Sequence, residues 1–193
     1  MRIIDLQPDQ RQLIEQLAAL LVESFQADWP NAWPTLAAAR QEVLESLEPD
    51  RLSRVAVDPA GAALGWIGAI RQYDGHVWEL HPLVVRTDRR RQGLGRALVA
   101  DLEEQVRRRG GLTLWLGTDD ENNMTSLGGV DLFPNVLEHA AKIRNRRGHP
   151  YEFYQKLGFV IVGVLPNANG PGKPDIYMAK PVDNYQLPMS NDQ

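Results

Sequence analysis

The stretch that decides the fold runs from His76 to Arg109 and reads HVWELHPLVVRTDRRRQGLGRALVADLEEQVRRR. Its first part, His76 to Val85, is rich in β-branched and aromatic side chains, which predicts a strand. A basic segment with two glycines follows, and from Leu94 to Arg109 apolar residues recur at helical spacing. Gly110 and Gly111 end this helix, and LTLWLGT at 112–118 predicts a second strand. Strand, glycine loop, helix and strand form a βαβ unit, so we expect two parallel strands joined by a right-handed crossover.

The loop between the strand and the helix predicts an anion-binding site. Consecutive backbone N–H groups open the helix, glycine removes the Cβ that would hold a phosphate away, and arginines add charged donors. No Lys-Ser/Thr pair follows the glycines, as a Walker loop requires, and Leu98 stands where a dinucleotide fingerprint has its third glycine. A pyrophosphate cradle is the functional interpretation, and a tight turn with a solvated basic face is the alternative. The cradle candidates are Arg90, Arg91, Gln92, Gly93, Leu94, Gly95 and Arg96.

The composition is that of an ordinary globular protein with a mildly acidic charge. The 193 residues suffice for one domain with a buried core, which we place at 1–182, with a polar tail at 183–193. The net charge of −4 argues against a nucleic-acid partner, and the absence of cysteine excludes thiolate catalysis. The four histidines are scattered without ligand spacing, so we expect no metal. Without a signal peptide or a long apolar run, we expect a cytoplasmic protein with no membrane partner.

The elements on either side of this unit predict an α/β fold with a mixed sheet of about six or seven strands. Before it we expect a strand at 2–6, helices at 8–25 and 35–47, and strands at 54–57 and 64–72. After it we expect a helix at 132–145, a short helix at 149–159, and strands at 160–165 and 176–179. Pro82 cannot donate to a sheet ladder, so it implies a bulge or a locally unpaired edge in the central strand.

Two motifs resemble those of a known family. The glycine loop matches the Arg/Gln-x-x-Gly-x-Gly/Ala loop with which GCN5-related N-acetyltransferases hold the pyrophosphate of acetyl-coenzyme A (acetyl-CoA). The segment from Tyr154 to Phe159 matches their Tyr-x-x-x-Gly-Phe motif, about 60 residues later. Four longer strings, at 78–85, 116–120, 149–154 and 162–170, are similar to the aminoglycoside 6′-N-acetyltransferases, and the likeness covers nearly the whole chain.

The resemblance implies the acetyltransferase fold, with flanking helices and a splayed central parallel pair of strands. It also implies acetyl transfer from acetyl-CoA to the 6′-amine of aminoglycosides, antibiotic resistance and a homodimer. The N-terminal Trp-Pro region at 27–34 is longer than in that family, which puts the shape of the acceptor pocket in doubt.

In such an enzyme the splayed gap would take the pantetheine arm, and the backbone of Leu83, Val84 and Val85 would pair with its amides. By resemblance, the Leu83 N–H would also polarise the thioester carbonyl. Alternation along the strand puts Glu79, His81 and Leu83 on one face. Because the acceptor ammonium must lose a proton before it attacks, Glu79 is the candidate general base and His81 its relay. The alternative is that Glu79 only anchors a cationic sugar and His81 is a packed side chain.

Tyr154 is the candidate acid for the departing thiolate, because a phenol is neutral at pH 7 and can donate a proton. A purely structural aromatic pair with Tyr151 is the competing interpretation. A polycationic acceptor calls for carboxylates, and Asp119 and Asp120 follow a strand end of the kind where ligands collect. The expected acceptor contacts are Trp29, Tyr73, Glu79, Asp119, Asp120 and Glu138. Loop packing for Trp29 and plain solvation for Glu138 are the alternatives.

Two other functions are compatible with the sequence. Acidic side chains also suit a polyamine, so acetyl transfer to another amine, such as a polyamine or a peptide N-terminus, is one alternative. The other is a non-catalytic module that binds acyl-coenzyme A, which predicts cofactor binding without turnover.

Overall fold

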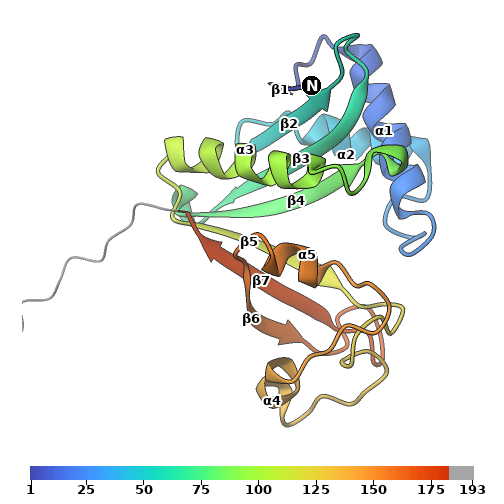
Figure 1. The fold of residues 1–193 in the computed structure, drawn as a ribbon, viewed down its shortest axis with the longest axis vertical. Helices are drawn as coiled ribbons and strands as arrows, with labels where there is room; N and C mark the ends of the chain where they lie inside the picture. The colour runs from blue at the N-terminus through green and yellow to red at the C-terminus, as the bar shows by residue number, and fades with distance from the viewer. Residues whose placement is uncertain (183–193) are drawn as a thin grey trace, which may run out of the picture.

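A seven-stranded mixed sheet flanked by helices forms the core of the computed structural model, which describes residues 1–182 (Figure 1). The strands are β1 (Arg2–Asp5), β2 (Arg51–Val57), β3 (Ala63–Gln72), β4 (Val77–Val85), β5 (Thr113–Asp119), β6 (Val160–Leu165) and β7 (Asp175–Pro181). The helices are α1 (Arg11–Phe25), α2 (Leu36–Glu45), α3 (Leu94–Arg108), α4 (Val136–Ala141) and α5 (Tyr151–Gln155). The predicted tail at 183–193 lies outside the described residues.

The strand order β1-β2-β3-β4-β5-β7-β6 has one parallel pair within residues 1–182, β4 with β5. This confirms the predicted α/β class, the number of strands and the central βαβ unit. No helix in that part of the chain is long and apolar enough to cross a membrane.

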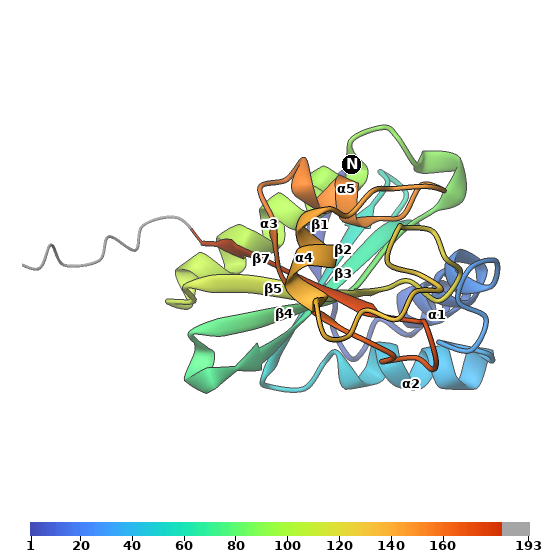
Figure 2. The same ribbon diagram turned by 90° about the horizontal axis from the view of Figure 1, so that it is seen from below.

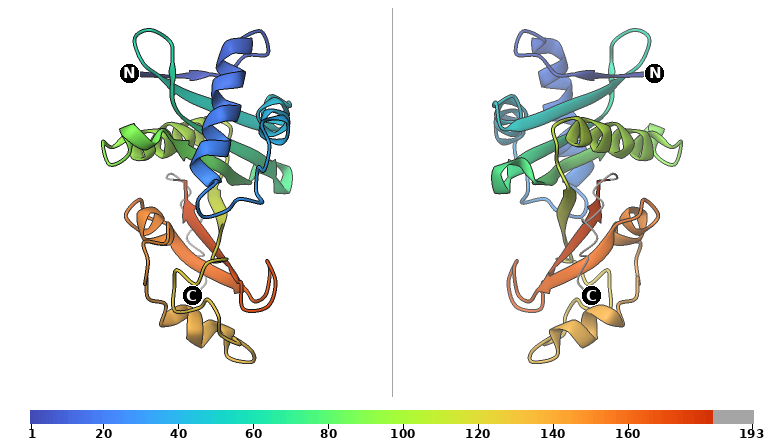
Figure 3. Two further views of the ribbon diagram at one scale, coloured as in Figure 1. Left: turned by 90° about the vertical axis from the view of Figure 1, so that its right-hand side faces the viewer. Right: turned by 90° about the vertical axis from the view of Figure 1, so that its left-hand side faces the viewer.

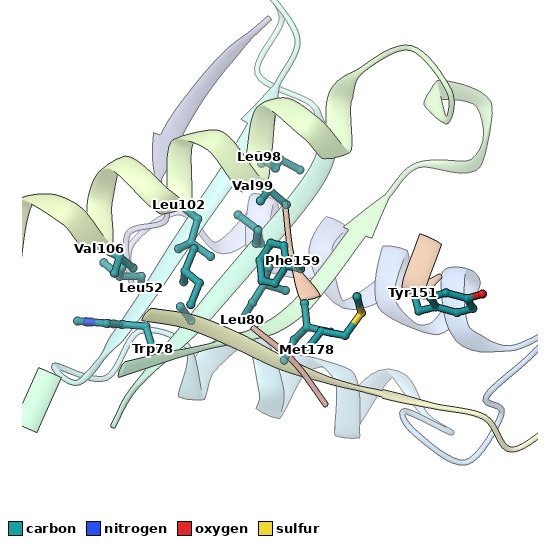
Figure 4. Packing of buried hydrophobic residues seen from close by; sticks show 14 of the residues in the cluster. Leu52, Trp78, Leu80, Leu98, Val99, Leu102, Val106, Tyr151, Phe159 and Met178 are labelled. Atoms are coloured by element: carbon teal, nitrogen blue, oxygen red, sulfur yellow. The ribbon is translucent and has the colours of Figure 1, made fainter. Parts of the chain in front are cut away.

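Two apolar layers hold the helices against the sheet. Leu98 and Leu102 of α3 are fully buried and pack in one layer with Trp78 of β4 (Figure 4). Leu17 of α1 packs in the other layer with Trp66 of β3. Figures 2 and 3 show α3 and α5 on one side of the strands, with α2 on the opposite side. Full burial of each such side chain contributes about 1.5–3 kcal/mol to folding, so both layers fix the sheet firmly.

Helix α2 begins at a defined cap. The Thr35 side chain accepts a hydrogen bond from Ala38 N at 3.1 Å, which confirms the predicted N-cap. Two Trp-Pro dipeptides stand in the preceding loop, at 29–30 and 33–34, and each disfavours helix at the residue before proline. This loop therefore interrupts the helix between α1 and α2.

Strand β4 carries the feature that opens the sheet. Its pairing with β5 runs only from Val77 to Glu79, and beyond Glu79 the two strands separate. In the ladder with β3, a register shift places His81 and Pro82 opposite the single residue Gly68. This confirms both the predicted bulge and the predicted splay. A Cβ on Gly68 would lie 2.4 Å from the His81 carbonyl oxygen, so only glycine allows this approach.

The bulge also overturns one expectation. Leu80 and Leu83 both pack in the α3 layer, because the extra residue of the bulge shifts the alternation by one. Glu79 and His81 therefore point to the face that α2 covers, and Leu83 points to the opposite face. The prediction that Glu79, His81 and Leu83 share one face is wrong.

Three predicted boundaries also need correction. The helix expected at 132–145 is only the six-residue α4, because Pro134 disfavours helix at Phe133 and Leu132 is buried within the loop. Strand β2 begins at Arg51 rather than at 54, and β7 runs from 175 to 181 rather than from 176 to 179.

Candidate active site

A cavity of about 1080 Å³ occupies the gap between β4 and β5. One wall is the stretch of β4 from Leu80 to Val85, and another is the end of β5 from Gly117 to Asp119. The lining also includes the first turn of α3, the loop between α1 and α2, α5, and single residues of α1, α2 and the loops after β5. Because the strands separate here, backbone on the β5 side of β4 faces the cavity instead of another strand.

The loop before α3 lies at the cavity with its helix start open, as a predicted anion cradle requires. Gly93 caps α3 in a left-handed conformation, with φ 84° and no side-chain cap, so the first N–H groups of the helix have no side-chain acceptor. No heavy atom lies within 4 Å of an ideal Cβ there, which leaves the space beside the loop open. The cradle residues on the cavity wall are Arg90, Arg91, Gly93, Leu94, Gly95 and Arg96. This arrangement fits a polyphosphate.

Gln92 departs from its prediction as a cradle residue. Its side chain does not line the cavity; Nε2 donates to the Asp88 carbonyl oxygen at 3.1 Å, because the loop turns that side chain back on itself. Arg90 has a second local contact, from Nε to the Val85 carbonyl oxygen at 3.2 Å. Gln92 therefore braces the loop, and Arg90 ties the loop to the end of β4.

The stretch of β4 that has no partner on its β5 side and Tyr154 meet at the same cavity. Leu83, Val84 and Val85 line it from β4, and Tyr154 lines it from α5. The Tyr154 ring packs edge-on against Phe159 with centroids 5.6 Å apart, which fixes its orientation. Burial raises the pKa of Tyr154, so its phenol keeps its proton at neutral pH and can act as a donor.

Asp119 and Asp120 are adjacent in sequence but have different roles in the structure. Asp119 lines the cavity, and its carboxylate accepts a hydrogen bond from Asn169. Asp120 is fully buried and accepts bonds from Met124 N at 2.6 Å, Thr125 N at 2.9 Å and Thr125 Oγ1 at 2.7 Å. Asp120 thus closes the loop after β5, and its placement contradicts the prediction that it contacts an acceptor.

Two more predicted acceptor contacts lie outside the cavity. Tyr73 is 75% exposed in the single 3₁₀ turn (Tyr73–Gly75) that precedes β4. Glu138 lies on α4, where it forms an ion pair with Lys142 at 2.7 Å. Neither residue follows a strand that opens toward the cavity, so the prediction that Tyr73 and Glu138 contact the acceptor is wrong.

Trp29 does line the cavity, as part of an aromatic group that the sequence only partly indicated. The ring centroids of Phe25 and Trp29 are 5.9 Å apart, and those of Phe25 and Trp33 are 4.6 Å apart in a T-shaped pair. All three side chains line the cavity from α1 and the following loop. The two Trp-Pro dipeptides predicted tryptophans on a loop. The direction in which those side chains point depends on tertiary packing, which the sequence pattern does not show.

Three cavity carboxylates were also missed. Asp28 follows α1, Glu42 lies on α2 and Glu121 follows β5. With Asp119 they face a cavity whose cations come from the loop before α3. The lining therefore combines a basic cradle with carboxylates from other elements, which suits one anionic and one cationic ligand.

Glu79 and His81 share a face but have different partners. Glu79 Oε2 accepts a hydrogen bond from Gln72 Nε2 at 2.7 Å, and Glu79 does not line the cavity. His81 does line the cavity, and its Nε2 lies 3.7 Å from Glu42 Oε1. Of the two predicted proton carriers, His81 is the one that the structure brings to the cavity wall.

A half-buried carboxylate, Asp175, and a buried imidazole, His149, lie near the end of β5. Burial, together with the nearby Asp119 charge, raises the pKa of Asp175 to about 6. Burial lowers the pKa of His149, whose Nδ1 accepts from Tyr151 N at 3.2 Å while Nε2 lies 3.1 Å from the Asp119 carbonyl oxygen. A neutral imidazole satisfies both contacts, so His149 ties α5 to β5. Among residues 1–182 no group of three side chains could hold a metal ion.

Comparisons with known proteins give consistent matches. The model of the acetyltransferase (GNAT) family matches residues 14–128. The structure of an aminoglycoside 6′-N-acetyltransferase complexed with coenzyme A is 43% identical, with a TM-score of 0.88, and the match covers 97% of this chain and 100% of that chain. An aminoglycoside 6′-N-acetyltransferase from Enterococcus faecium is 43% identical with a TM-score of 0.86 and the same coverage. An aminoglycoside 6′-acetyltransferase type Ii is 38% identical with a TM-score of 0.72, covering 96% and 100%. A comparison with curated proteins found no match.

Proposed function

Because this chain belongs to the acetyltransferase (GNAT) family, we propose that its cavity transfers the acetyl group of acetyl-CoA to the 6′-amine of aminoglycoside antibiotics, which confers resistance. The observation that carries the proposal is the cavity itself. It joins a glycine–arginine cradle, a stretch of β4 with no partner strand on its β5 side, and a set of carboxylates in one space. The structures at 43% identity support the substrate pair.

The residues of the gap fit coenzyme A. The backbone N–H groups at the start of α3, with Arg90, Arg91 and Arg96, would hold the pyrophosphate. The pantetheine amides would pair with the β5 side of β4 between Leu83 and Val85, where no partner strand lies. When bound, acetyl-CoA supplies an acetyl thioester.

The reaction is direct attack by the acceptor amine on the thioester carbon: a C–N bond forms and the C–S bond breaks. The Leu83 N–H donates to the carbonyl oxygen, where negative charge develops. The acceptor nitrogen loses two protons in all, and the first goes from the ammonium to a basic side chain, for which Glu79 and His81 are the candidates. Tyr154 donates its phenolic proton to the leaving sulfur and regains one from the second proton, which the nitrogen releases as the C–N bond forms. Burial raises the pKa of Tyr154, so the phenol holds its proton at neutral pH before this step.

The remaining lining would hold the acceptor. Asp28, Glu42, Asp119 and Glu121 provide negative charge for a molecule with several ammonium groups. The aromatic rings at the end of α1 and in the loop that follows provide flat apolar surface for sugar rings. The overall charge of −4 suits such a cation and not a nucleic acid.

The proposal includes a homodimer in the cytoplasm, where acetyl-CoA is available. Strand β6 is the last strand of the sheet order, and Val160, Val162 and Leu165 on it are 60%, 58% and 48% exposed. An apolar edge strand of this kind is normally covered, and a second copy would cover it. Light scattering should give twice the chain mass for the wild type and a smaller mass for Val162→Lys.

Thiol release from acetyl-CoA, measured in parallel with kanamycin and with spermidine, tests the proposed function. We expect turnover with kanamycin and little with spermidine. Turnover with spermidine alone would move the function to polyamine acetylation. Binding of acetyl-CoA with no turnover of either amine would favour a non-catalytic acyl-coenzyme A module.

A further inference from the structure

His81 stands at the β4 bulge with a carboxylate beside it. Glu42 Oε1, from α2, lies 3.7 Å from His81 Nε2. The Glu42 side chain is only 16% exposed and that of His81 is 40% exposed, and both line the cavity. The carboxylate is thus largely withdrawn from solvent, while the imidazole is open to a ligand in the cavity.

The imidazole is also held from a second direction. The Trp33 ring packs beside it with centroids 5.8 Å apart and planes tilted by 45°, and Trp33 in turn packs edge-on against Phe25. Glu42 Oε1 faces Nε2 at 3.7 Å, which is an ion-pair distance and longer than a hydrogen bond. The tilted Trp33 ring beside the imidazole and the Glu42 carboxylate near Nε2 together restrict the orientation of the His81 side chain, as the partners of a histidine base do in enzymes.

The charged groups around this histidine are few. Arg51 Nη1, from β2, lies 3.9 Å from the same Oε1 of Glu42, so this oxygen stands between Arg51 and His81. Glu79 points to the same face from β4 but is hydrogen-bonded to Gln72 and lies off the cavity wall. His81 is therefore the basic group with access to an acceptor, and Glu42 is its charged neighbour.

We propose that Glu42 is a positioning residue that holds His81 to take the proton from the acceptor ammonium; this inference rests on the proposed function. One proton passes from the acceptor nitrogen to the His81 imidazole, and the ring later returns it to solvent. The positive charge that this transfer forms on the ring is stabilised by the adjacent Glu42 carboxylate. Glu42 itself does not touch the reacting atoms.

The first test replaces the charge without changing the shape. Glu42→Gln should lower kcat with kanamycin about tenfold, part of the hundredfold or greater contribution of a general base. KM for acetyl-CoA and the melting temperature should stay at wild-type values. Glu42→Asp keeps the charge and should recover most of the lost kcat. Glu45→Gln is the matched control on the same helix, because the Glu45 carboxylate bonds Gln41 at 3.0 Å instead of His81.

The second test asks whether Glu42 acts through His81. In a His81→Ala background, Glu42→Gln should cause no further loss of kcat, because the group it positions is gone. A tenfold loss in that background as well, or a wild-type kcat for Glu42→Gln alone, would overturn the inference while leaving the proposed function intact. Failure of the wild type to turn over kanamycin would instead overturn the proposed function, and the inference with it.

Discussion

The bulge of β4 depends on the absence of a side chain at Gly68, so Gly68→Ala tests how the sheet opens. An added Cβ would lie 2.4 Å from the His81 carbonyl oxygen and 3.4 Å from Pro82 Cδ. Contacts of a Cβ below 3.0 Å essentially do not occur, so the strands must separate by about 0.6 Å or more. The obstructing atoms belong to backbone and to a proline ring, and they cannot rotate away.

The expected cost follows from this geometry. Overpacking typically costs about 1–3 kcal/mol, and a backbone obstacle belongs at the upper end of that range. Alanine lowers the entropy of the unfolded chain, which returns about 0.4–1 kcal/mol. The net loss in the free energy of unfolding should be about 2 kcal/mol. Because His81 and Leu83 shift with the bulge, kcat/KM should fall about tenfold or more.

Urea unfolding and kanamycin kinetics measure the two effects. Gly163→Ala in β6 is the matched control, because its Cβ would lie at an ordinary 3.8 Å from Tyr177 Cδ2. The control should stay within about 0.5 kcal/mol of the wild type with unchanged kinetics. If Gly68→Ala also matched the wild type in both assays, the bulge would not set the opening of the cavity and the reasoning would be refuted.

Three further substitutions test the cradle, the acid and a buried carboxylate. Arg91→Ala should raise KM for acetyl-CoA about tenfold with a smaller change in kcat. Arg89 lies outside the cavity, so Arg89→Ala should change neither constant. An unchanged KM for Arg91→Ala would count against the cradle. Tyr154→Phe keeps the ring contacts but should lower kcat about tenfold or more at unchanged KM, and wild-type kcat would remove the phenol from the chemistry. The folded-state pKa of Asp175, about 6, exceeds its ordinary 3.8, so the wild type should lose stability as pH rises through that window. In urea unfolding, the free energy of unfolding of Asp175→Asn relative to that of the wild type should rise by about 2 kcal/mol between about pH 4 and pH 8. This value is reduced for partial solvent access. A difference that does not depend on pH would contradict the prediction.

Local sequence rules were sufficient for α3 and for the glycine loop that precedes it. The helix predicted at 94–109 is observed at Leu94–Arg108, because apolar spacing and the terminal glycines act within the segment itself. Pro82 likewise indicated the bulge, since a missing N–H is a property of that residue alone. The effect of the bulge on Leu83 was not predictable from alternation, because one inserted residue reverses the faces of everything after it.

Contacts between distant segments could not be predicted from the sequence. Asp119 and Asp120 are the same residue type side by side, and only the fold of the following loop directs Asp120 to Thr125 and leaves Asp119 at the cavity. Glu42 resembles any polar residue on an exposed helix face. Its meeting with His81 depends on the crossing of α2 over the bulge of β4, which no local pattern encodes.

The most direct test of the proposed function compares two acceptors that differ at one atom. Neomycin carries an amine at the 6′ position, and paromomycin carries a hydroxyl there with the rest of the molecule unchanged. We expect thiol release from acetyl-CoA with neomycin, acetyl on the 6′ nitrogen of the product, and no release with paromomycin. Equal turnover of the two would contradict transfer to the 6′-amine.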